Sequence, residues 1–183
     1  MKFFETPLCG AYTIELEPYR DDRGFFTRAY CKNEFEAIPD CKEFVQFNHS
    51  FTIRKWSLRG LHYQMPPRAE NKLIRCIRGK VLDVIVDIRN GSPTFLHHFA
   101  VELSAVNMKM IYVPEGFAHG FQTMEDHTEL LYFHSAFYSA EHEGGIRYSD
   151  PRLRIDWPMP PSEISGKDMN HQLLTESFKG ITL

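Results

Sequence analysis

The chain has 183 residues, of which 43% are hydrophobic and 14% aromatic, so it is long enough to fill one hydrophobic core and short for two domains. We therefore expect a single domain over residues 1–183. The net charge of −3, without a long run of one sign, argues against broad affinity for nucleic acids or anionic membranes. No apolar run approaches the roughly eighteen residues of a membrane span, so none is predicted.

The cysteines indicate the redox compartment. They are widely spaced and include no Cys-x-x-Cys pair: Cys9, Cys31, Cys41 and Cys76. The apolar start of the chain, Phe3 and Phe4, is too short for the apolar region of a secretory signal peptide. We therefore expect free thiols in a cytoplasmic protein.

Taken in order, the chain consists of short alternating runs separated by turn signals, which is typical of an antiparallel β-barrel or β-sandwich. Strands are predicted at residues 10–16, 44–51, 73–77, 80–88, 99–103, 109–113 and 129–138. Turns are predicted at 19–24, 78–79 and 90–93, and a tight connection at 114–120. Short helices are expected at 32–37, before Pro39, and within 162–168.

The strand predicted at 44–51 has two unlike faces, because successive side chains of a strand point to opposite sides. One face carries Phe44, Gln46, Asn48 and Ser50, and the other carries Val45, Phe47, His49 and Phe51. This pattern favours a barrel with a polar lumen, whose outer face packs against a second layer. The same alternation in the strand at 129–138 puts Tyr132 and Tyr138 on one face.

Residues 57–72 concentrate chemically useful side chains in two predicted strands joined by a Pro-Pro turn. Arg59 suits an anionic ligand such as phosphate, and His62 is of the type that changes charge near neutral pH. Lys72, on the next strand, is suited to face a developing oxyanion. The alternative is a solvated strand pair with a half-buried histidine.

A second motif, Pro114-x-Gly-x-x-His119, resembles the hairpin motif of cupin barrels, which directs its histidine into the lumen. Metal-binding cupins carry a His-x-His pair in their first motif, whereas this chain has only His62, followed by Tyr63 and Gln64. The sequence therefore predicts no catalytic metal. The remaining histidines near predicted turns are expected on the surface: His97, His98, His127, His142 and His171.

An ordered set of motifs from Gly10 to about Leu174 resembles the dTDP-4-dehydrorhamnose 3,5-epimerase family. The motifs are Asp22-Arg-Gly-Phe-Phe26, Gln46-x-Asn48, Arg59-Gly-Leu-His-Tyr-Gln64, Asn71-Lys72, Asp83-Val, Asp87-x-Arg89, Ser92-Pro-Thr94, Pro114-x-Gly-Phe-Ala-His-Gly-Phe121, Leu131-Tyr132, Glu141-His-Glu-Gly-Gly-Ile146 and Ser165-x-Lys-Asp168. The resemblance implies an all-β cupin jelly-roll barrel with short peripheral helices. It also implies a homodimer without metal or other cofactor, acting on a nucleotide-diphosphate-linked 4-keto-6-deoxyhexose in deoxysugar biosynthesis for surface polysaccharide.

The resemblance also assigns roles to residues. His62 matches the base that removes a proton beside the ketone, and Asp168 matches its carboxylate partner. Lys72 matches the residue that stabilises the enolate oxygen, and Tyr132 matches the acid on the opposite face. The residues that match substrate-binding positions are Arg23, Arg59 and His119 for the sugar and diphosphate, Gln46, Asn48, Glu143 and Lys167 for the pocket wall, and Tyr138 for stacking on the base.

Structural roles remain open for three of these residues. Tyr138 is also consistent with packing at the barrel mouth, Asp168 with a carboxylate at a helix start, and Glu143 with a solvated acidic turn.

One departure from the family pattern concerns the nucleotide. The family usually has a Glu two residues after Phe26, where it accepts a hydrogen bond from thymine, and this chain has Arg28. Because cytosine presents an acceptor at N3 and thymine a donor, Arg28 is expected to favour a CDP-linked substrate over a dTDP-linked one. The alternative is that Arg28 pairs with an acidic neighbour and leaves base recognition to Tyr138.

Two further departures, Phe133 and Trp56, bear on whether C3, C5 or both are inverted, because 3-only and 5-only epimerases share the catalytic set. Two other functions remain as alternatives: a cupin sugar 3,4-ketoisomerase and a non-catalytic cupin that binds a nucleotide sugar.

Overall fold

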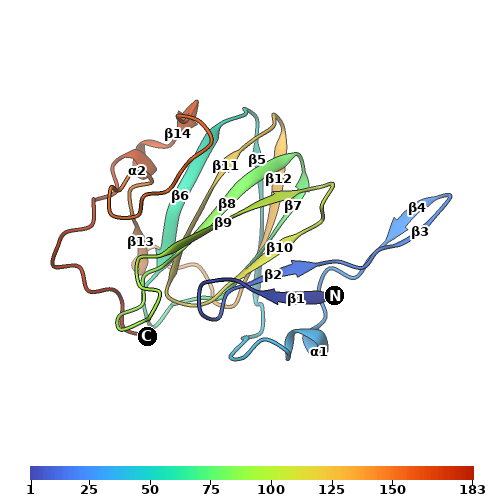
Figure 1. The fold of residues 1–183 in the computed structure, drawn as a ribbon, viewed down its shortest axis with the longest axis horizontal. Coiled ribbons are helices and arrows are strands. Elements are labelled where there is room, and N and C mark those ends of the chain that lie inside the picture. The colour runs from blue at the N-terminus through green and yellow to red at the C-terminus, as the bar shows by residue number, and fades with distance from the viewer.

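The computed structural model describes residues 1–183 and consists mainly of two β-sheets that face each other (Figure 1). The first sheet contains, in spatial order, β1 (Lys2–Glu5), β2 (Tyr12–Glu15), β10 (Met110–Val113), β7 (Lys72–Arg78), β12 (Thr128–His134) and β5 (Gln46–Thr52). The second contains β13 (Glu143–Gly145), β6 (Ser57–Gln64), β11 (Phe117–Thr123), β8 (Lys80–Asp87) and β9 (His98–Ser104), with β14 (Glu163–Ile164) paired to β6.

Strands that follow one another in sequence repeatedly change sheet. For example, β7 lies in the first sheet and β8 in the second, and the single residue between them, Gly79, has a φ of +73° that favours glycine. All pairings within the two sheets are antiparallel except the short one between β14 and β6. This alternation produces a jelly roll. The predicted all-β cupin barrel is therefore confirmed.

Three apolar clusters hold the layers together. The inner cluster joins both sheets, with Ile74 and Leu130 from the first and Ile85 and Phe121 from the second. A second cluster packs helix α1 (Lys32–Phe35) and Phe44 against the outside of the first sheet, and a third packs the segment from Ile146 to Ile181 against the outside of the second. Burial of these side chains leaves only part of the space between the sheets for polar residues.

One outer surface has no such cover. On β5 and beside it, Val45 is 46%, Phe47 65% and Phe51 48% exposed. The predicted two-faced character of this strand is present, but the prediction that its apolar face packs against a second layer is wrong within the chain, because α1 and Phe44 cover only the neighbouring part of the sheet.

Most predicted strands lie within two residues of their predicted ends, and two predictions fail for physical reasons. The connection predicted at 114–120 is shorter, because β11 starts at Phe117. That strand is buried along its whole length between the inner and third clusters, so it lacks alternation. The strand predicted at 129–138 ends at His134, because both neighbouring strands end there. The residues paired with His134 are Gln46, the first of β5, and Lys72, the first of β7. Tyr138 therefore does not share a strand face with Tyr132.

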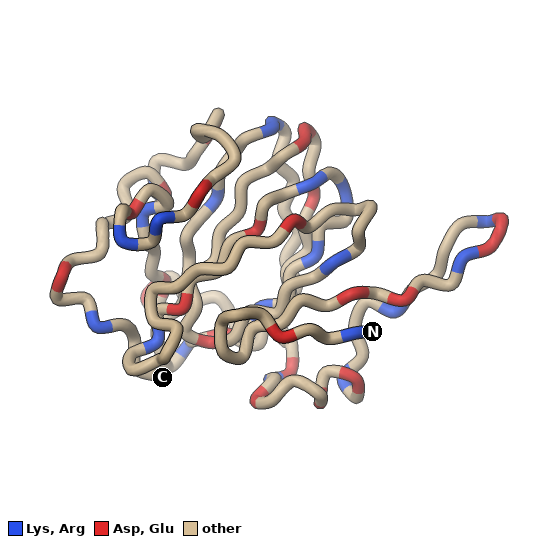
Figure 2. Tube along the Cα trace, viewed as in Figure 1, with Lys and Arg blue, Asp and Glu red and all other residues tan.

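The region predicted as a turn at 19–24 forms a two-stranded hairpin of β3 (Tyr19–Asp21) and β4 (Gly24–Phe26) that projects away from the barrel (Figure 1). Its tip carries basic and acidic residues next to each other (Figure 2). The helices are short and peripheral, as predicted: α1 lies below the first sheet, and α2 (Gly166–Met169) lies near β6. Neither the length nor the apolar character that a membrane-spanning segment requires is found in any of the helices.

Candidate active site

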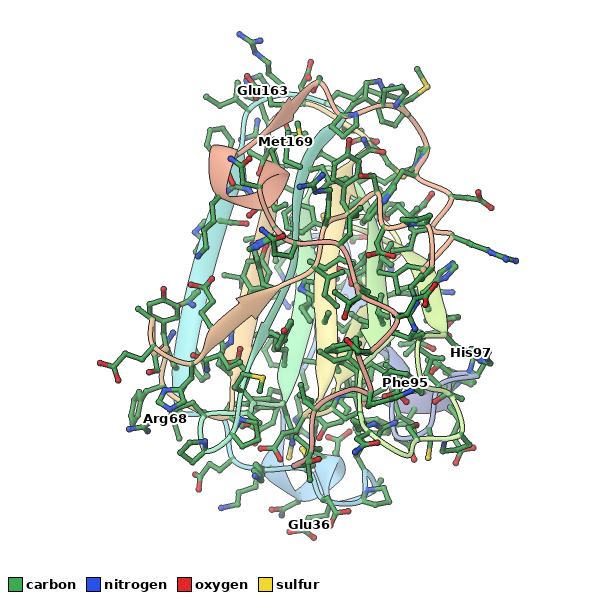
Figure 3. All side chains as sticks on the ribbon, turned by 90° about the vertical axis from the view of Figure 1, so that its left-hand side faces the viewer. Glu36, Arg68, Phe95, His97, Glu163 and Met169 are labelled. Carbon is green, nitrogen blue, oxygen red and sulfur yellow. The ribbon has the colours of Figure 1, made fainter.

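A cavity of about 860 Å³ opens between the two sheets, near α2. Figure 3 shows the α2 end, where Glu163 and Met169 lie, opposite the end that carries Glu36. The cavity brings together most of the residues predicted from the sequence, from both sheets and from α2: Asn48, Arg59, His62, Lys72, His119, Tyr132, Lys167 and Asp168.

His62 and Asp168 form a close pair in this cavity. His62 Nε2 lies 2.7 Å from Asp168 Oδ1, and the N–H of Gly60 donates to Asp168 Oδ2 at 3.0 Å. Burial alone would raise the pKa of Asp168, but the hydrogen bonds from His62 and Gly60 outweigh it and hold the pKa below its ordinary value. Asp168 is therefore a carboxylate at neutral pH, and it leaves His62 Nδ1 as the nitrogen free to accept a proton.

Two features of the local chain fix this pair. Ser165 caps α2 by accepting a hydrogen bond from the N–H of Asp168 at 3.0 Å, which holds the carboxylate at the first turn. Gly60 has a φ of +120°, and a Cβ there would lie 2.6 Å from the Cα of Gly120. The glycine therefore lets β6 and β11 approach closely, with His62 opposite His119 in the register.

Tyr132 reaches the cavity from β12, in the opposite sheet to His62. Its hydroxyl lies 3.0 Å from Ser50 Oγ. Burial raises the pKa of Tyr132 far above its ordinary value. The phenol is therefore protonated at neutral pH and available as a proton donor.

Lys72 lies on the cavity wall beside a group that the sequence analysis missed. Its Nζ lies 3.2 Å from Glu70 Oε1 and 3.4 Å from the backbone oxygen of His62. Glu70 also lies 2.8 Å from His134 Nδ1. Burial alone would raise the pKa of Glu70, but the contacts with His134 and Lys72 lower it below its ordinary value. The signal for His134 was present, because it alternates with Tyr132 along the strand.

The candidate anion-binding side chains have different surroundings. Arg59 Nε donates to Thr52 Oγ1 at 3.2 Å, which leaves the other guanidinium nitrogens free. His119 Nε2 lies 3.0 and 2.9 Å from the two carboxylate oxygens of the fully buried Asp83, so only its Nδ1 is free for a ligand.

The remaining predicted residues on this side form a hydrogen-bonded rim. The N–H of Tyr138 donates to Gln46 Oε1 at 3.0 Å, and the Tyr138 hydroxyl donates to Glu143 Oε2 at 2.8 Å. Lys167 Nζ lies 2.6 Å from the same oxygen. Burial opposes ionisation of Glu143, but the contacts with Lys167 and Tyr138 outweigh it and lower the pKa of Glu143. Glu143 and Lys167 therefore form an ion pair beside Tyr138 rather than a solvated turn.

Five predicted residues do not line the cavity of this chain: Gln46, Tyr138 and Glu143 lie at its rim, and Arg23 and Arg28 lie away from it. Arg23, 91% exposed, lies in the projecting hairpin and pairs with Asp21 at 2.6 Å. Arg28 follows the hairpin and pairs with Glu34 at 2.6 Å, as in the alternative considered for it. Because the hairpin points away from the barrel (Figure 1), the substrate-binding role of these two residues stays a prediction.

His171 was predicted on the surface, and this is also wrong. Its ring packs edge-on against His62 at 5.6 Å, and its Nε2, buried without a hydrogen-bond partner, lies 3.7 Å from Asp168 Oδ1. These three side chains offer ligand atoms within 4.8 Å of one another and form a group able to hold a metal ion. The pair of His62 and Asp168 is already joined by a proton, which a metal would have to displace.

The fold and the site define a class of protein. A cupin-type barrel that directs a histidine–carboxylate pair and a protonated tyrosine into one cavity from opposite sheets is built for acid–base catalysis. The family model described as dTDP-4-dehydrorhamnose 3,5-epimerase matches residues 5–176. The chain belongs to the dTDP-4-dehydrorhamnose 3,5-epimerase family.

Similar proteins cover almost the whole chain. The dTDP-4-dehydrorhamnose 3,5-epimerase of Shigella flexneri is 43% identical over 97% of this chain and 98% of its own length. The crystal structure of the Bacillus anthracis enzyme, with TDP and PPi bound, superposes with a TM-score of 0.92 at 42% identity, over 94% of this chain and 99% of that one.

A third relative is described as an epimerase of one position only. A 3′-monoepimerase from Streptomyces bikiniensis in complex with dTDP-quinovose gives a TM-score of 0.86 at 30% identity, over 92% of this chain and 85% of that one. The predicted family and the predicted activity of an epimerase, which is an isomerase, are confirmed.

Proposed function

We propose that the protein epimerises a nucleotide-diphosphate-linked 4-keto-6-deoxyhexose at C3, C5 or both, with His62 as base and Tyr132 as acid. The observation that carries this proposal is the placement of these two side chains on opposite sheets around one cavity. Inversion at carbon requires that a proton leave one face and another arrive on the opposite face. Two acid–base groups on facing walls meet this requirement.

The reaction begins at the C–H bonds beside the C4 ketone, which the carbonyl acidifies. His62 Nδ1 takes the proton, the electron pair of the C–H bond forms a C=C bond, and the carbonyl electrons move to the oxygen to give an enolate. Asp168, bound to Nε2, fixes the tautomer and stabilises the imidazolium that forms. Tyr132 then gives its phenolic proton to the opposite face of the same carbon, and the ketone reforms.

Lys72 is the residue proposed to stabilise the enolate oxygen. Its side chain is 9% exposed on the cavity wall, so its charge acts in a poorly solvated place, where electrostatic stabilisation is strong. Arg59 and His119 are proposed to bind the sugar and diphosphate, Gln46, Asn48, Glu143 and Lys167 to line the substrate pocket, and Tyr138 to stack on the base. The nucleotides bound in the two solved relatives named above support a nucleotide-sugar substrate.

The assembly proposed is a homodimer in which the hairpin of one protomer reaches the other's cavity. In the single chain, the hairpin residues Tyr19 and Phe26 are 80% and 76% exposed. The apolar outer face of β5, which includes Phe47, is also largely exposed. Apolar surface of this extent usually marks an interaction site. A second copy would cover it and would bring Arg23 to a diphosphate.

The nucleotide and the biological setting belong to the proposal. A CDP-linked substrate is the hypothesis that follows from Arg28, and it requires this side chain to leave Glu34. The four cysteines are free thiols, which supports the cytoplasm as the site of action, and the whole chain is proposed to act as one domain in deoxysugar synthesis for surface polysaccharide.

The experiment is proton NMR in D2O with CDP- and dTDP-linked 4-keto-6-deoxyglucose, followed separately at C3 and C5. Replacement of hydrogen by deuterium with inversion supports the proposal, and the exchanging carbon defines 3-only, 5-only or double epimerisation. A 3,4-ketoisomerase would instead move the carbonyl from C4 to C3. Nucleotide-sugar binding without exchange at carbon would point to a binding protein and contradict the proposal.

A further inference from the structure

Two ionisable side chains at the cavity take no part in the proposed proton transfers: His134 lines the cavity, and Glu70 contacts the lining residues Lys72 and His134. Glu70 precedes β7, and His134 ends β12. Their side chains are 8% and 12% exposed. His134 is the register partner of Lys72 on one side and of Gln46 on the other, so these three side chains form a row across β7, β12 and β5.

A continuous series of hydrogen bonds runs along this wall to Glu70. The N–H of Tyr138 donates to Gln46 Oε1 at 3.0 Å, and Gln46 Nε2 donates to Asn48 Oδ1 at 3.2 Å. Asn48 Nδ2 lies 3.2 Å from His134 Nε2, and His134 Nδ1 lies 2.8 Å from Glu70 Oε2. The series thus joins the rim, where Tyr138 lies, to the cavity wall.

The ends of the series determine its direction. A backbone N–H only donates and a carboxylate only accepts, so each group between Tyr138 and Glu70 donates toward Glu70. His134 must then carry its proton on Nδ1 and use Nε2 as an acceptor. A doubly protonated ring would place an N–H against the amide N–H of Asn48, so His134 is neutral here.

Lys72 approaches the same carboxylate from the other side, with Nζ 3.2 Å from Glu70 Oε1. Each carboxylate oxygen of Glu70 therefore contacts a different side chain. Oε1 contacts the Lys72 ammonium that is proposed to stabilise the enolate, and Oε2 accepts from the His134 imidazole, which orients the amides. The buried carboxylate of Glu70 therefore determines which group donates and which accepts in every hydrogen bond of the series.

We propose that Glu70 is a positioning residue, which holds Lys72 against the reacting ketone and, through neutral His134, orients the amides of Asn48 and Gln46 toward the substrate. The part that concerns Lys72 rests on the proposed function. The orientation of His134 and of the amides does not, because it follows from the hydrogen bonds alone.

The substitution Glu70→Gln tests the proposal, because glutamine has nearly the same shape as glutamate but replaces one of the two accepting oxygens by an NH2 donor. A glutamine that accepts from Lys72 presents its NH2 group to His134 Nδ1, and this drives the histidine to its other tautomer. Nitrogen-15 NMR of the imidazole distinguishes the Nδ1–H, Nε2–H and doubly protonated forms. We expect Nδ1–H in the wild type and Nε2–H in Glu70→Gln.

The same variant should lose activity through Lys72. We expect kcat for exchange to fall about ten- to a hundredfold, as for other losses of alignment. Glu102→Gln is the matched control, because Glu102 on β9 pairs with Lys80 on β8, outside the cavity. It removes one carboxylate without touching the series.

A second variant keeps the test decisive if Glu70→Gln does not fold. Asn48→Asp places a carboxylate against His134 Nε2, so the ring should become doubly protonated between two acceptors. The proposed orientation would be overturned if His134 in the wild type were protonated on Nε2 or on both nitrogens. It would also be overturned if neither variant changed the protonation of His134. A normal kcat in folded Glu70→Gln would overturn the positioning of Lys72. A wild type without exchange would refute the proposed function, and the tautomers would still decide the orientation.

Discussion

The side chains of His62 and Asp168 lie 2.7 Å apart, although the two residues are 106 positions apart in the sequence. His62 comes from β6 and Asp168 from the first turn of α2. The N–H of Gly60 binds the Asp168 carboxylate, and Ser165 Oγ accepts from the Asp168 backbone N–H. The contact fixes Nε2 of the imidazole, so the opposite nitrogen is presented to the cavity. The proposed base therefore depends on a residue from a distant part of the chain.

Asp168→Asn is expected to lower kcat by about 10²–10⁴, because the amide can hold the imidazole in the wrong tautomer and does not stabilise the imidazolium. The measurement is the initial rate of deuterium incorporation at C3 and C5. Binding of the nucleoside diphosphate should persist, since Arg59 and His119 are untouched. A variant that folds, binds nucleotide and exchanges at the wild-type rate would remove Asp168 from the proposed mechanism.

Tyr132→Phe separates the two halves of the reaction. His62 can still remove a proton and return a deuteron to the same face, so exchange with retention should continue, while inversion falls by about a hundredfold or more. Tyr112→Phe is the matched control, because Tyr112 is also buried in the first sheet but belongs to the cluster outside the cavity. Equal loss of exchange and inversion in Tyr132→Phe would contradict the role of a separate acid.

The sequence was sufficient for the fold class and for predicting eight residues that the fold gathers in one candidate site, because both depend on local patterns. The alternation at 44–51 identified Gln46 and Asn48 on the polar side, and ordered motifs identified His62, Lys72 and Tyr132. The failures concern contacts between distant residues. The burial of His171 against Asp168 depends on where the C-terminal segment folds back. Local patterns also did not indicate that Arg23 lies in a hairpin that leaves the barrel, and its predicted role stays untested within one chain.

Arg28 gives a prediction about the nucleotide. Arg28→Glu should shift the ratio of kcat/KM toward the dTDP-linked substrate by about tenfold, the equivalent of roughly one hydrogen bond. Glu34→Gln is the companion variant, because it breaks the ion pair that holds Arg28 in the single chain. It should increase the preference for the CDP-linked substrate if Arg28 moves to the base. An unchanged ratio in both variants would assign base recognition to other residues.

The proposed hairpin exchange predicts complementation between two inactive variants. Arg23→Ala should weaken the diphosphate site, and His62→Asn should remove the base. In a heterodimer, the cavity with intact His62 would receive the intact Arg23 of the second chain. Equal mixing should therefore restore about a quarter of the wild-type activity, since half of the dimers are mixed and each has one complete cavity.

The mixed sample also tests the alternative arrangement. If Arg23 served the cavity of its own chain, every cavity in the mixture would lack one residue, and activity would stay at the level of the separate variants. Size-exclusion chromatography with light scattering shows whether the variants are dimers. A monomer, or a dimer without complementation, would contradict the exchange.

The low pKa of Glu70 makes its contribution to stability depend on pH. A carboxylate with a folded-state pKa below its unfolded value of about 4.3 stabilises the protein above that pH, and the contribution is lost as the pH falls through the folded-state pKa. Glu70→Gln should therefore be about 1.5–3 kcal/mol less stable than the wild type at pH 7, the range for hydrogen bonds to a charged group. Urea unfolding at several pH values measures this difference.

The difference between wild type and Glu70→Gln should shrink as the pH falls below about 4, because a protonated Glu70 no longer offers two charged acceptors to Lys72 and His134. The control, Glu102→Gln, should differ from the wild type by less than about 0.5 kcal/mol at each pH, since its side chain is 45% exposed. A difference for Glu70→Gln that stayed constant down to low pH would mean that the buried carboxylate is not charged in the folded protein.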